Sequence, residues 1–329
     1  MHISNEIYNQ VIKEYDEKKR LRDYLIQSRI DELREKVPGY LEADLEVSKN
    51  ASVFLDKFLS SQHNDKERTD YHNLIEEVKA KKLSLMKKAG YPADFLDPPY
   101  ECATCRDTGY VDGETCHCFR QKLLDRVFLQ EPLIKQLSMC ELSDFSLEYY
   151  PRDTYDKTSG IDSYSSAQKA LEDAGTFINE FDKRHGNLII YGSTGAGKTF
   201  LSCCIGNAIN RQGYTVVYQT ANRFFNIISD FTFRRDGGGH DKYKSIFESD
   251  LLILDDLGTE LSNSFTNSAV FDCINDRIIN GRSTIISTNL SAQEIFDTYT
   301  GRVFSRLSND YIWLHLFGTD VRIRSKKLQ

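Results

Sequence analysis

A glycine-rich stretch from Gly192 to Thr199 carries the residue types that bind a polyphosphate. It fits the pattern G-x-x-x-x-G-K-[ST] at every fixed position. The apolar run Asn187–Tyr191 before it predicts a buried strand, and the run Phe200–Ile205 after it predicts the start of a helix. A strand, a glycine loop and a helix N-terminus together allow backbone N–H groups to surround phosphate oxygens. The stretch therefore predicts a nucleotide phosphate site.

Each position of this loop has an expected part in the site. Lys198 reaches the outer phosphates, and the hydroxyl of Thr199 binds Mg²⁺. A glycine-rich turn without a ligand is the alternative, but pattern and context both argue against it. The residues expected to contact the nucleotide here are Gly192, Ser193, Thr194, Gly195, Ala196, Gly197, Lys198, Thr199 and Phe200.

A second stretch ends in two neighbouring carboxylates. The apolar run Leu251–Leu254 predicts a strand buried on both faces, as in a parallel sheet. Asp255 and Asp256 follow at its C-terminal end, where open α/β sheets bind ligands. We expect Asp255 to hold Mg²⁺ through water and Asp256 to orient and deprotonate the attacking water. Since aspartate reaches less far than glutamate, Asp256 predicts slow or gated hydrolysis.

A polar amide and two pairs of arginines follow these acids. The run 283–288 predicts a strand ending at Asn289, which would lie beside the γ-phosphate or would instead cap the next helix. Arg302 and Arg306 are four residues apart and share one face if this segment is helical. Farther on, the arginines of the run 321–324 alternate with apolar residues, so both point to one side of an expected strand.

Four cysteines lie within one short segment. Cys102-x-x-Cys105 is followed by Cys116-x-Cys118, a set of thiols that suits one tetrahedral Zn²⁺. So short a segment has almost no core of its own, so metal binding would supply most of its folding free energy. His117 is a possible replacement for one of the cysteines, and reduced thiols or a redox pair are the alternatives to zinc. With four protein ligands, a bound zinc ion would be structural.

Composition sets the limits for these sites. A chain of 329 residues predicts about two domains. Its net charge of −7 does not favour nucleic-acid binding by the chain as a whole, although a local basic patch stays possible. We expect no membrane span, because there is no long apolar run, and no secretory signal in Met1–Asn9. These features predict a cytoplasmic protein, in which eight cysteines serve as metal ligands or buried thiols.

Three regions are expected along the chain. Residues 1–89 are charged and poor in glycine, with apolar residues at helical spacing and a break at Pro38–Gly39. This helical region either binds a partner or simply packs as a domain. Residues 90–140 hold the zinc-binding segment and a linker helix, and residues 141–329 hold the nucleotide domain. The remaining expected elements of the nucleotide domain are helices over 165–181, 222–231 and 265–280 and strands over 214–218, 311–317 and 321–323.

One loop of the nucleotide domain has the composition of a site for single-stranded nucleic acid. The segment Arg234–His240 contains two arginines and three glycines. Phe231, Phe233 and Tyr243 flank it, and aromatic rings next to positive charge can stack with bases. A surface loop without a ligand is the alternative.

The order of these motifs resembles the AAA+ ATPases. Within that class the chain is similar to the bacterial helicase loaders of the DnaC and DnaI type, with the IstB transposition helpers as close relatives. The region Gly90–Gln121 also resembles the cysteine-rich segment of Gram-positive loaders. The residues that carry the resemblance in the nucleotide domain are Gly192–Thr199, Leu251–Gly258, Ser287–Leu290 and Gly301–Leu307.

The resemblance implies a fold and a set of site residues. The fold is a three-layer α/β/α P-loop NTPase domain with a parallel sheet and without a helical lid. Lys198 and Thr199 correspond to the Walker A motif, and Asp255 and Asp256 correspond to Walker B. Asn289 corresponds to sensor 1.

The same resemblance implies two roles for arginines: one acts on the neighbouring subunit, and one senses the bound nucleotide. Arg306 corresponds to the arginine finger, which acts on ATP held by the neighbouring subunit, and Arg302 supports it. Arg322 corresponds to sensor 2, with Arg324 as the alternative. The residues expected to act in hydrolysis are therefore Asp256, Asn289 and Arg306.

The resemblance also implies partners. The expected protein is an ATPase that uses ATP, Mg²⁺ and Zn²⁺ and forms an ATP-dependent homo-oligomer. It would bind a replicative hexameric DNA helicase and single-stranded DNA, and hydrolysis would release it. An IstB-like helper of DNA transposition is the alternative. A small-molecule kinase is a third class, but nothing after Asn289 supplies the substrate pocket and lid that it needs. The residues identify neither the helicase, nor the number of subunits, nor a chromosomal or mobile-element origin.

Overall fold

The computed structural model describes residues 3–46, 65–128, 140–183, 186–233, 239–318 and 320. The chain divides into two compact units. One is formed by residues 1–11 with 112–329, and the other by residues 12–111. The limits expected at residues 90 and 141 stay predictions.

A five-stranded parallel sheet is the centre of the larger unit. The strand β6 lies between β5 and β3, so the C-terminal ends of these three strands meet at one edge of the sheet. The residues of β5, which begins with an apolar run, are nearly all buried, and those of β6 are all buried although it begins and ends with serine and threonine. In spatial order the strands are β4 (Val216–Thr220), β5 (Leu251–Leu257), β6 (Ser283–Thr288), β3 (Leu188–Tyr191) and β7 (Ile312–His315).

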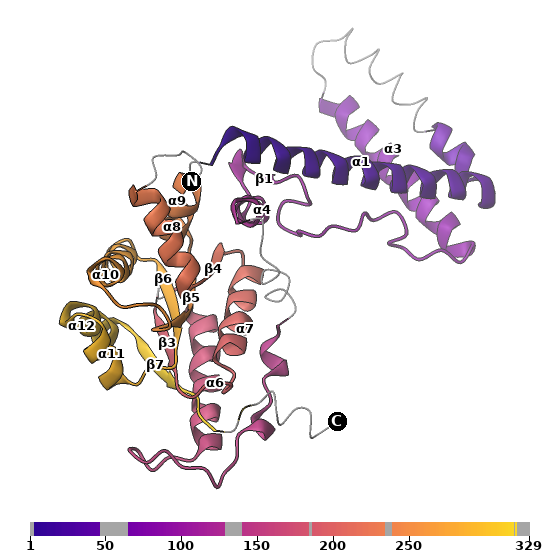
Figure 1. The fold of residues 1–329 in the computed structure, drawn as a ribbon. Helices are drawn as coiled ribbons and strands as arrows, with labels where there is room; N and C mark the ends of the chain where they lie inside the picture. Colours follow the sequence, from indigo (N-terminus) through magenta and orange to yellow (C-terminus); the bar gives the residue numbers. More distant parts are fainter. Residues whose placement is uncertain are drawn as a thin grey trace. The chain divides into compact units, whose positions relative to one another are not determined.

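Helices cover both faces of this sheet. Figure 1 shows α6 and α7 on one face and α8 and α10 on the other. The expected three-layer α/β/α arrangement with a parallel sheet is confirmed. The helices of the unit are α4 (His117–Val127), α6 (Ser163–Glu180), α7 (Lys198–Arg211), α8 (Ala221–Phe233), α9 (Gly239–Glu248), α10 (Ser264–Ile279), α11 (Ala292–Thr298) and α12 (Gly301–Asp310), with short 3₁₀ turns at Leu142–Asp144 and Leu147–Tyr149.

Polar side chains fix where two of these helices begin. Asn263 and Thr266 form a capping box at the start of α10, and Ser291 and Glu294 form another at the start of α11. In each box a side chain accepts from a backbone N–H that the helix leaves unpaired. The expected and observed boundaries of α10 therefore differ by a single residue at each end.

The smaller unit is helical. Its long helix α1 (Asn5–Lys36), whose first residues belong to the larger unit, ends just before Pro38–Gly39, where the sequence predicts a break. The helix α3 (Asp65–Lys88) follows later. The apolar residues of Val53–Phe58, whose spacing also predicts a helix, and the expected strand over 321–323 lie outside the described residues. A two-stranded hairpin, β1 (Tyr110–Val111) and β2 (Glu114–Thr115), then leads to α4. The core of the smaller unit is formed by Leu33, Val37, Tyr40 and Met86.

No helix in the described part of the chain combines the length and the apolar composition that a crossing of the bilayer needs.

A buried arginine holds three elements of the larger unit together. Arg277 on α10 is fully buried. Its guanidinium donates to the carbonyl oxygens of Ile246 (2.6 Å), Ser249 (3.1 Å) and Ser283 (2.5 Å). Burial lowers the pKa of Arg277 to about 10, so the side chain stays charged at neutral pH. It thereby neutralises carbonyl dipoles at the end of α9 and the start of β6.

Replacing this arginine will destabilise the fold. Arg277→Met leaves three buried carbonyls without their donor, which costs about 3 kcal/mol or more. Urea denaturation followed by circular dichroism measures the change in the free energy of unfolding. The control Arg211→Met removes a side chain that is 60% exposed and paired with Glu141, and we expect it to cost less than about 1 kcal/mol. Equal losses in the two variants would contradict this account of Arg277.

Candidate functional site

The loop between β3 and α7 has a backbone conformation that glycine adopts more readily than other residues. Gly192 has φ 133° and Gly197 has φ 88°, values that disfavour other residues. A Cβ atom at Gly192 would lie 1.9 Å from the carbonyl oxygen of Leu316. Gly197 is the N-cap of α7, so the loop passes directly into a helix N-terminus. The predicted strand, glycine loop and helix are all present.

A buried aromatic side chain donates a hydrogen bond to the backbone of the glycine loop. The hydroxyl of Tyr150 donates to the carbonyl oxygen of Ala196 at 2.7 Å. The ring of Tyr150 stacks on Phe145 with a centroid separation of 5.5 Å, and both side chains belong to the buried core. Burial raises the pKa of Tyr150, which keeps its hydroxyl protonated and donating. Tyr150 therefore connects the glycine loop to the buried core.

Lys198 is held inside the loop. Its Nζ donates to the carbonyl oxygens of Gly192 (3.0 Å) and Ser193 (2.8 Å) and to Oδ1 of Asn289 (2.6 Å). The structure thus brings together Lys198 and Asn289, which are far apart in the sequence. Their expected roles at the γ-phosphate stay predictions, and this geometry is compatible with them.

Asp255 is the buried acid of the site. Its carboxylate accepts hydrogen bonds from Thr199 Oγ1 at 3.0 and 3.1 Å, from the Tyr218 hydroxyl at 2.6 Å and from Ser287 Oγ. Three hydroxyl groups therefore surround a carboxylate that is almost fully buried. The two residues predicted to hold Mg²⁺, Thr199 and Asp255, are in direct contact, and their oxygen atoms are the ligand type that Mg²⁺ prefers.

Sequence reasoning missed Tyr218 and Ser287. Both lie on strands that pair with β5, and the register places them close to Asp255 in space. Burial, reinforced by the charge of Asp255, raises the pKa of Tyr218, so its hydroxyl remains a donor to the carboxylate. The sequence does place a polar side chain near the C-terminal end of each of these two strands. Only the strand order, however, shows that both strands are neighbours of β5.

Asp256 has an unusual backbone. Its φ is 58°, in the left-handed region, and the pairing of β5 with β6 is irregular between Leu254 and Leu257. Its N–H donates to Ser287 Oγ at 2.9 Å, and its carbonyl accepts from Thr259 Oγ1 at 2.9 Å. Aspartate is one of the few non-glycine residues that enter this region at low cost. The choice of aspartate over glutamate here thus has a conformational reason as well as the expected effect on hydrolysis.

Arg306 lies on α12 and has no described contact with the P-loop. It donates to Oδ1 of Asn275 on α10 at 2.8 Å, with Asp310 at 3.7 Å. Its side chain is 42% exposed, which suits a residue expected to act on a neighbouring subunit. Arg322 and Arg324 lie outside the described residues, so the assignment of sensor 2 stays a prediction.

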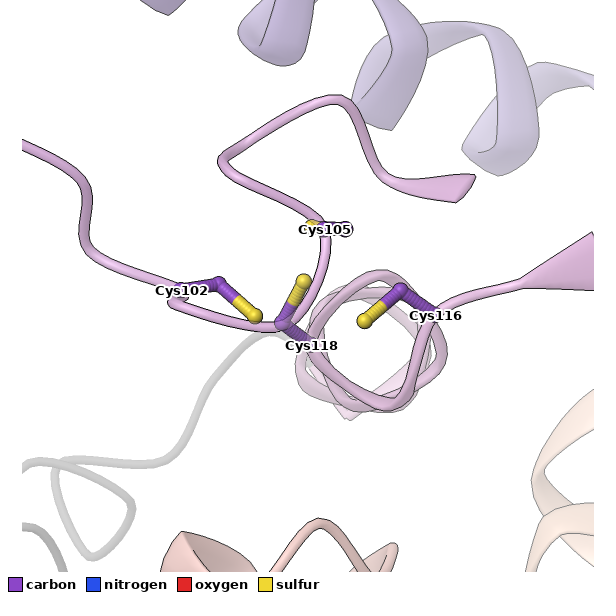
Figure 2. A group of neighbouring side chains, drawn as sticks. All are labelled: Cys102, Cys105, Cys116 and Cys118. Atoms are coloured by element: carbon purple, nitrogen blue, oxygen red, sulfur yellow. The ribbon is translucent and has the colours of Figure 1, made fainter. Parts of the chain in front are cut away.

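The four cysteines that are expected to bind zinc form a cluster. Figure 2 shows their sulfur atoms turned toward one another. Cys116 is the N-cap of α4 and Cys118 lies in its first turn, while Cys102 and Cys105 come from the preceding turn. All four ligand atoms lie within 4.8 Å of one another. Tetrahedral zinc with Zn–S bonds of 2.3 Å places its sulfur atoms about 3.8 Å apart, so a cluster of this size could hold one zinc ion.

Neighbouring side chains support this cluster. Asp107 accepts from the backbone N–H groups of Cys102 (2.8 Å) and Glu101 (3.0 Å). His117 is not one of the four clustered ligands, although its Nδ1 lies 3.5 Å from Cys116 Sγ. The described structure therefore favours four thiols over a set that includes His117.

The fold and the nucleotide site define a P-loop ATPase of the AAA+ class. Residues 155–312, a little under half of the chain, match the family model of the IstB-like ATP binding proteins.

Individual relatives match the chain at modest identity. An insertion sequence ATP-binding protein of Sinorhizobium fredii is 31% identical over 44% of this chain and 59% of its own length. The replicative helicase loader DnaC of Escherichia coli K12 is 26% identical over 42% of this chain and 56% of its own. A solved structure of a DnaC helicase loader is 22% identical, with a TM-score of 0.45, over 55% of this chain and 99% of that one. The chain therefore matches a little over half the length of these two curated relatives.

Zinc content tests the cysteine cluster. We expect purified protein to carry about one zinc ion per chain, and Cys102→Ser to lose it, because three thiolates hold the ion less tightly than four. Metal analysis by mass spectrometry measures this, and limited proteolysis of residues 90–121 reports the local unfolding that follows. Cys140→Ser, which lies outside the cluster, is the control and should keep its zinc. Zinc-free wild-type protein would rule out the site.

Proposed function

We propose that the protein is an ATP-dependent loader of a replicative DNA helicase. ATP and Mg²⁺ bind between the P-loop and the end of β5, and hydrolysis switches the protein from an assembled to a released state. The observation that carries the proposal is the direct contact of Thr199 with Asp255, next to the contact of Lys198 with Asn289. These contacts bring the two halves of a Walker site together. A cytoplasmic setting is part of the same proposal.

The residues of the site divide the work of hydrolysis. Lys198 exchanges the carbonyls of Gly192 and Ser193 for phosphate oxygens. Thr199 and Asp255 would hold Mg²⁺, which neutralises phosphate charge when bound. Asp256 accepts the proton of the attacking water, and Asn289 orients that water.

A second subunit completes the site. The exposed guanidinium of Arg306 lies on α12, and its described partners are on α10 and α12 rather than in the P-loop. We infer that it acts on ATP bound by the neighbouring subunit, where an arginine neutralises charge that develops on the phosphates. Hydrolysis would then depend on assembly.

The surface of α8 and α9 is our candidate for single-stranded DNA. Phe231 stacks on Tyr243 with a centroid separation of 3.8 Å, and Phe233 is 70% exposed. Exposed aromatic rings offer stacking platforms for bases of any sequence. The arginines expected to add charge, Arg234 and Arg235, lie outside the described residues.

The helical unit is our candidate for helicase contact. Its helix α1 exposes Leu21 and Tyr24, large apolar side chains that a partner could cover.

A helper function in DNA transposition is the second candidate. It is favoured by the match of residues 155–312 to the IstB-like family and by the insertion sequence relative. Affinity capture with the purified full chain separates the two functions: a replicative hexameric helicase is retained by a loader, and a transposase by a transposition helper. Failure to retain the helicase with ATP present would contradict our first proposal.

Arginine substitution tests the shared site. We expect Arg306→Ala to bind ATP like the wild type and to lose hydrolysis stimulated by helicase and single-stranded DNA, by roughly 10³-fold where the finger is fully engaged. Phosphate release measures the rate, and a fluorescent ATP analogue measures binding. The control Arg211→Ala removes an arginine at the C-terminal end of α7, and this variant should hydrolyse ATP at the wild-type rate. A wild-type rate in Arg306→Ala would refute the assignment.

A further inference from the structure

The turn that follows the Walker B strand is tied to the end of α11. The carboxylate of Glu260 accepts from the N–H of Gly258 at 2.9 Å and from the hydroxyl of Tyr299. Nearby, Ser262 Oγ donates to the carbonyl of Thr298 at 2.9 Å. The two ties join a segment that starts at Asp256 to a segment that leads into α12.

The same turn contacts the segment that carries Asn289. Gly258 has φ 96°, and a Cβ atom there would lie 2.4 Å from Cδ1 of Leu290. Leu290 directly follows Asn289 in the chain. The turn is therefore in contact with the residues next to both polar groups expected at the γ-phosphate.

Tyr299 is placed to pass a displacement of this turn on to α12. It is only 3% exposed, and the next residue, Thr300, is the N-cap of α12. Burial raises the pKa of Tyr299, and its hydrogen bond to Glu260 adds to the effect, so the hydroxyl stays protonated. The buried ring is thus packed directly before the first residue of α12. The helix that starts there carries Arg306.

We propose that Glu260 and Tyr299 form a positioning pair that transmits the state of a subunit's own nucleotide site to its own arginine finger. The pair links the turn after Asp256 to the start of α12, so ATP bound in one subunit sets where its Arg306 meets the next subunit. This inference rests on the proposed function, because it needs a finger that acts between subunits. The nucleotide site of one subunit would then influence hydrolysis in the neighbour that its Arg306 contacts.

A mixture of two variants tests the direction of this transfer. Arg306→Ala subunits keep an ATP site and lack the finger. Asp256→Asn subunits bind ATP and keep the finger but do not hydrolyse. In the mixture, hydrolysis occurs only where an Asp256→Asn subunit presents its finger to an Arg306→Ala neighbour. Tyr299→Phe, which removes one hydroxyl and keeps the ring, is then added to either type of subunit.

The expected result is asymmetric. Tyr299→Phe in the finger-presenting subunit lowers the rate of the mixture by roughly tenfold, the size expected when coupling of 1–2 kcal/mol is lost. In the hydrolysing subunit it changes the rate by less than about twofold, because that subunit's finger is absent. Glu260→Gln should show the same asymmetry, since glutamine keeps only one acceptor oxygen and so loses one of the two hydrogen bonds that the carboxylate accepts. Tyr155→Phe, a substitution of an exposed tyrosine, should have no effect on either side.

The other outcomes separate the two proposals. Equal losses on the two sides, or no loss on either, would overturn the positioning pair, and ATP binding by each variant shows that it is folded. A mixture that hydrolyses no faster than its separate components, before Tyr299 is changed, would instead overturn the trans-acting finger of the proposed function.

Discussion

The carboxylate of Asp255 is the constraint on which the nucleotide site depends. A buried charge is costly unless nearby groups donate hydrogen bonds to it. Here the donors come from three different elements: Thr199 from α7, Tyr218 from β4 and Ser287 from β6. The requirement to satisfy one carboxylate therefore fixes the P-loop helix and two strands around the end of β5. A bound metal would take over the Thr199 hydroxyl, while Tyr218 and Ser287 keep the carboxylate in place.

The turn after Asp255 adds a second constraint. The left-handed backbone of Asp256 is maintained by Ser287 and Thr259, and Glu260 fixes the residues that follow. A short acid on a turn held in this way has little freedom to approach a water by itself. The turn is also joined to the segment that leads into α12, through the hydrogen bonds from Tyr299 to Glu260 and from Ser262 to Thr298.

The sequence predicted the parts of the site that are local in the chain. The loop Gly192–Thr199 and the acids that end β5 are recognisable because each motif carries its own flanking strand or helix. The cysteines of the cluster are close in sequence, and their spacing alone predicted the arrangement. Tyr218, Ser287, Glu260 and Tyr299 were missed because their contacts depend on strand order and on the packing of α11, which no local pattern encodes. Arg306 was found through a family resemblance, and its half-exposed position on α12 fits the role without testing it.

A structure of the protein with Mg²⁺ and a non-hydrolysable ATP analogue tests the central claim most directly. Our account predicts the triphosphate along Gly192–Thr199, with Lys198 Nζ bonded to a phosphate oxygen in place of the carbonyls of Gly192 and Ser193. It also predicts that Thr199 and Asp255 lie on either side of the metal, with Tyr218 still bonded to Asp255. A nucleotide bound elsewhere, or a metal held without Thr199 and Asp255, would contradict the account.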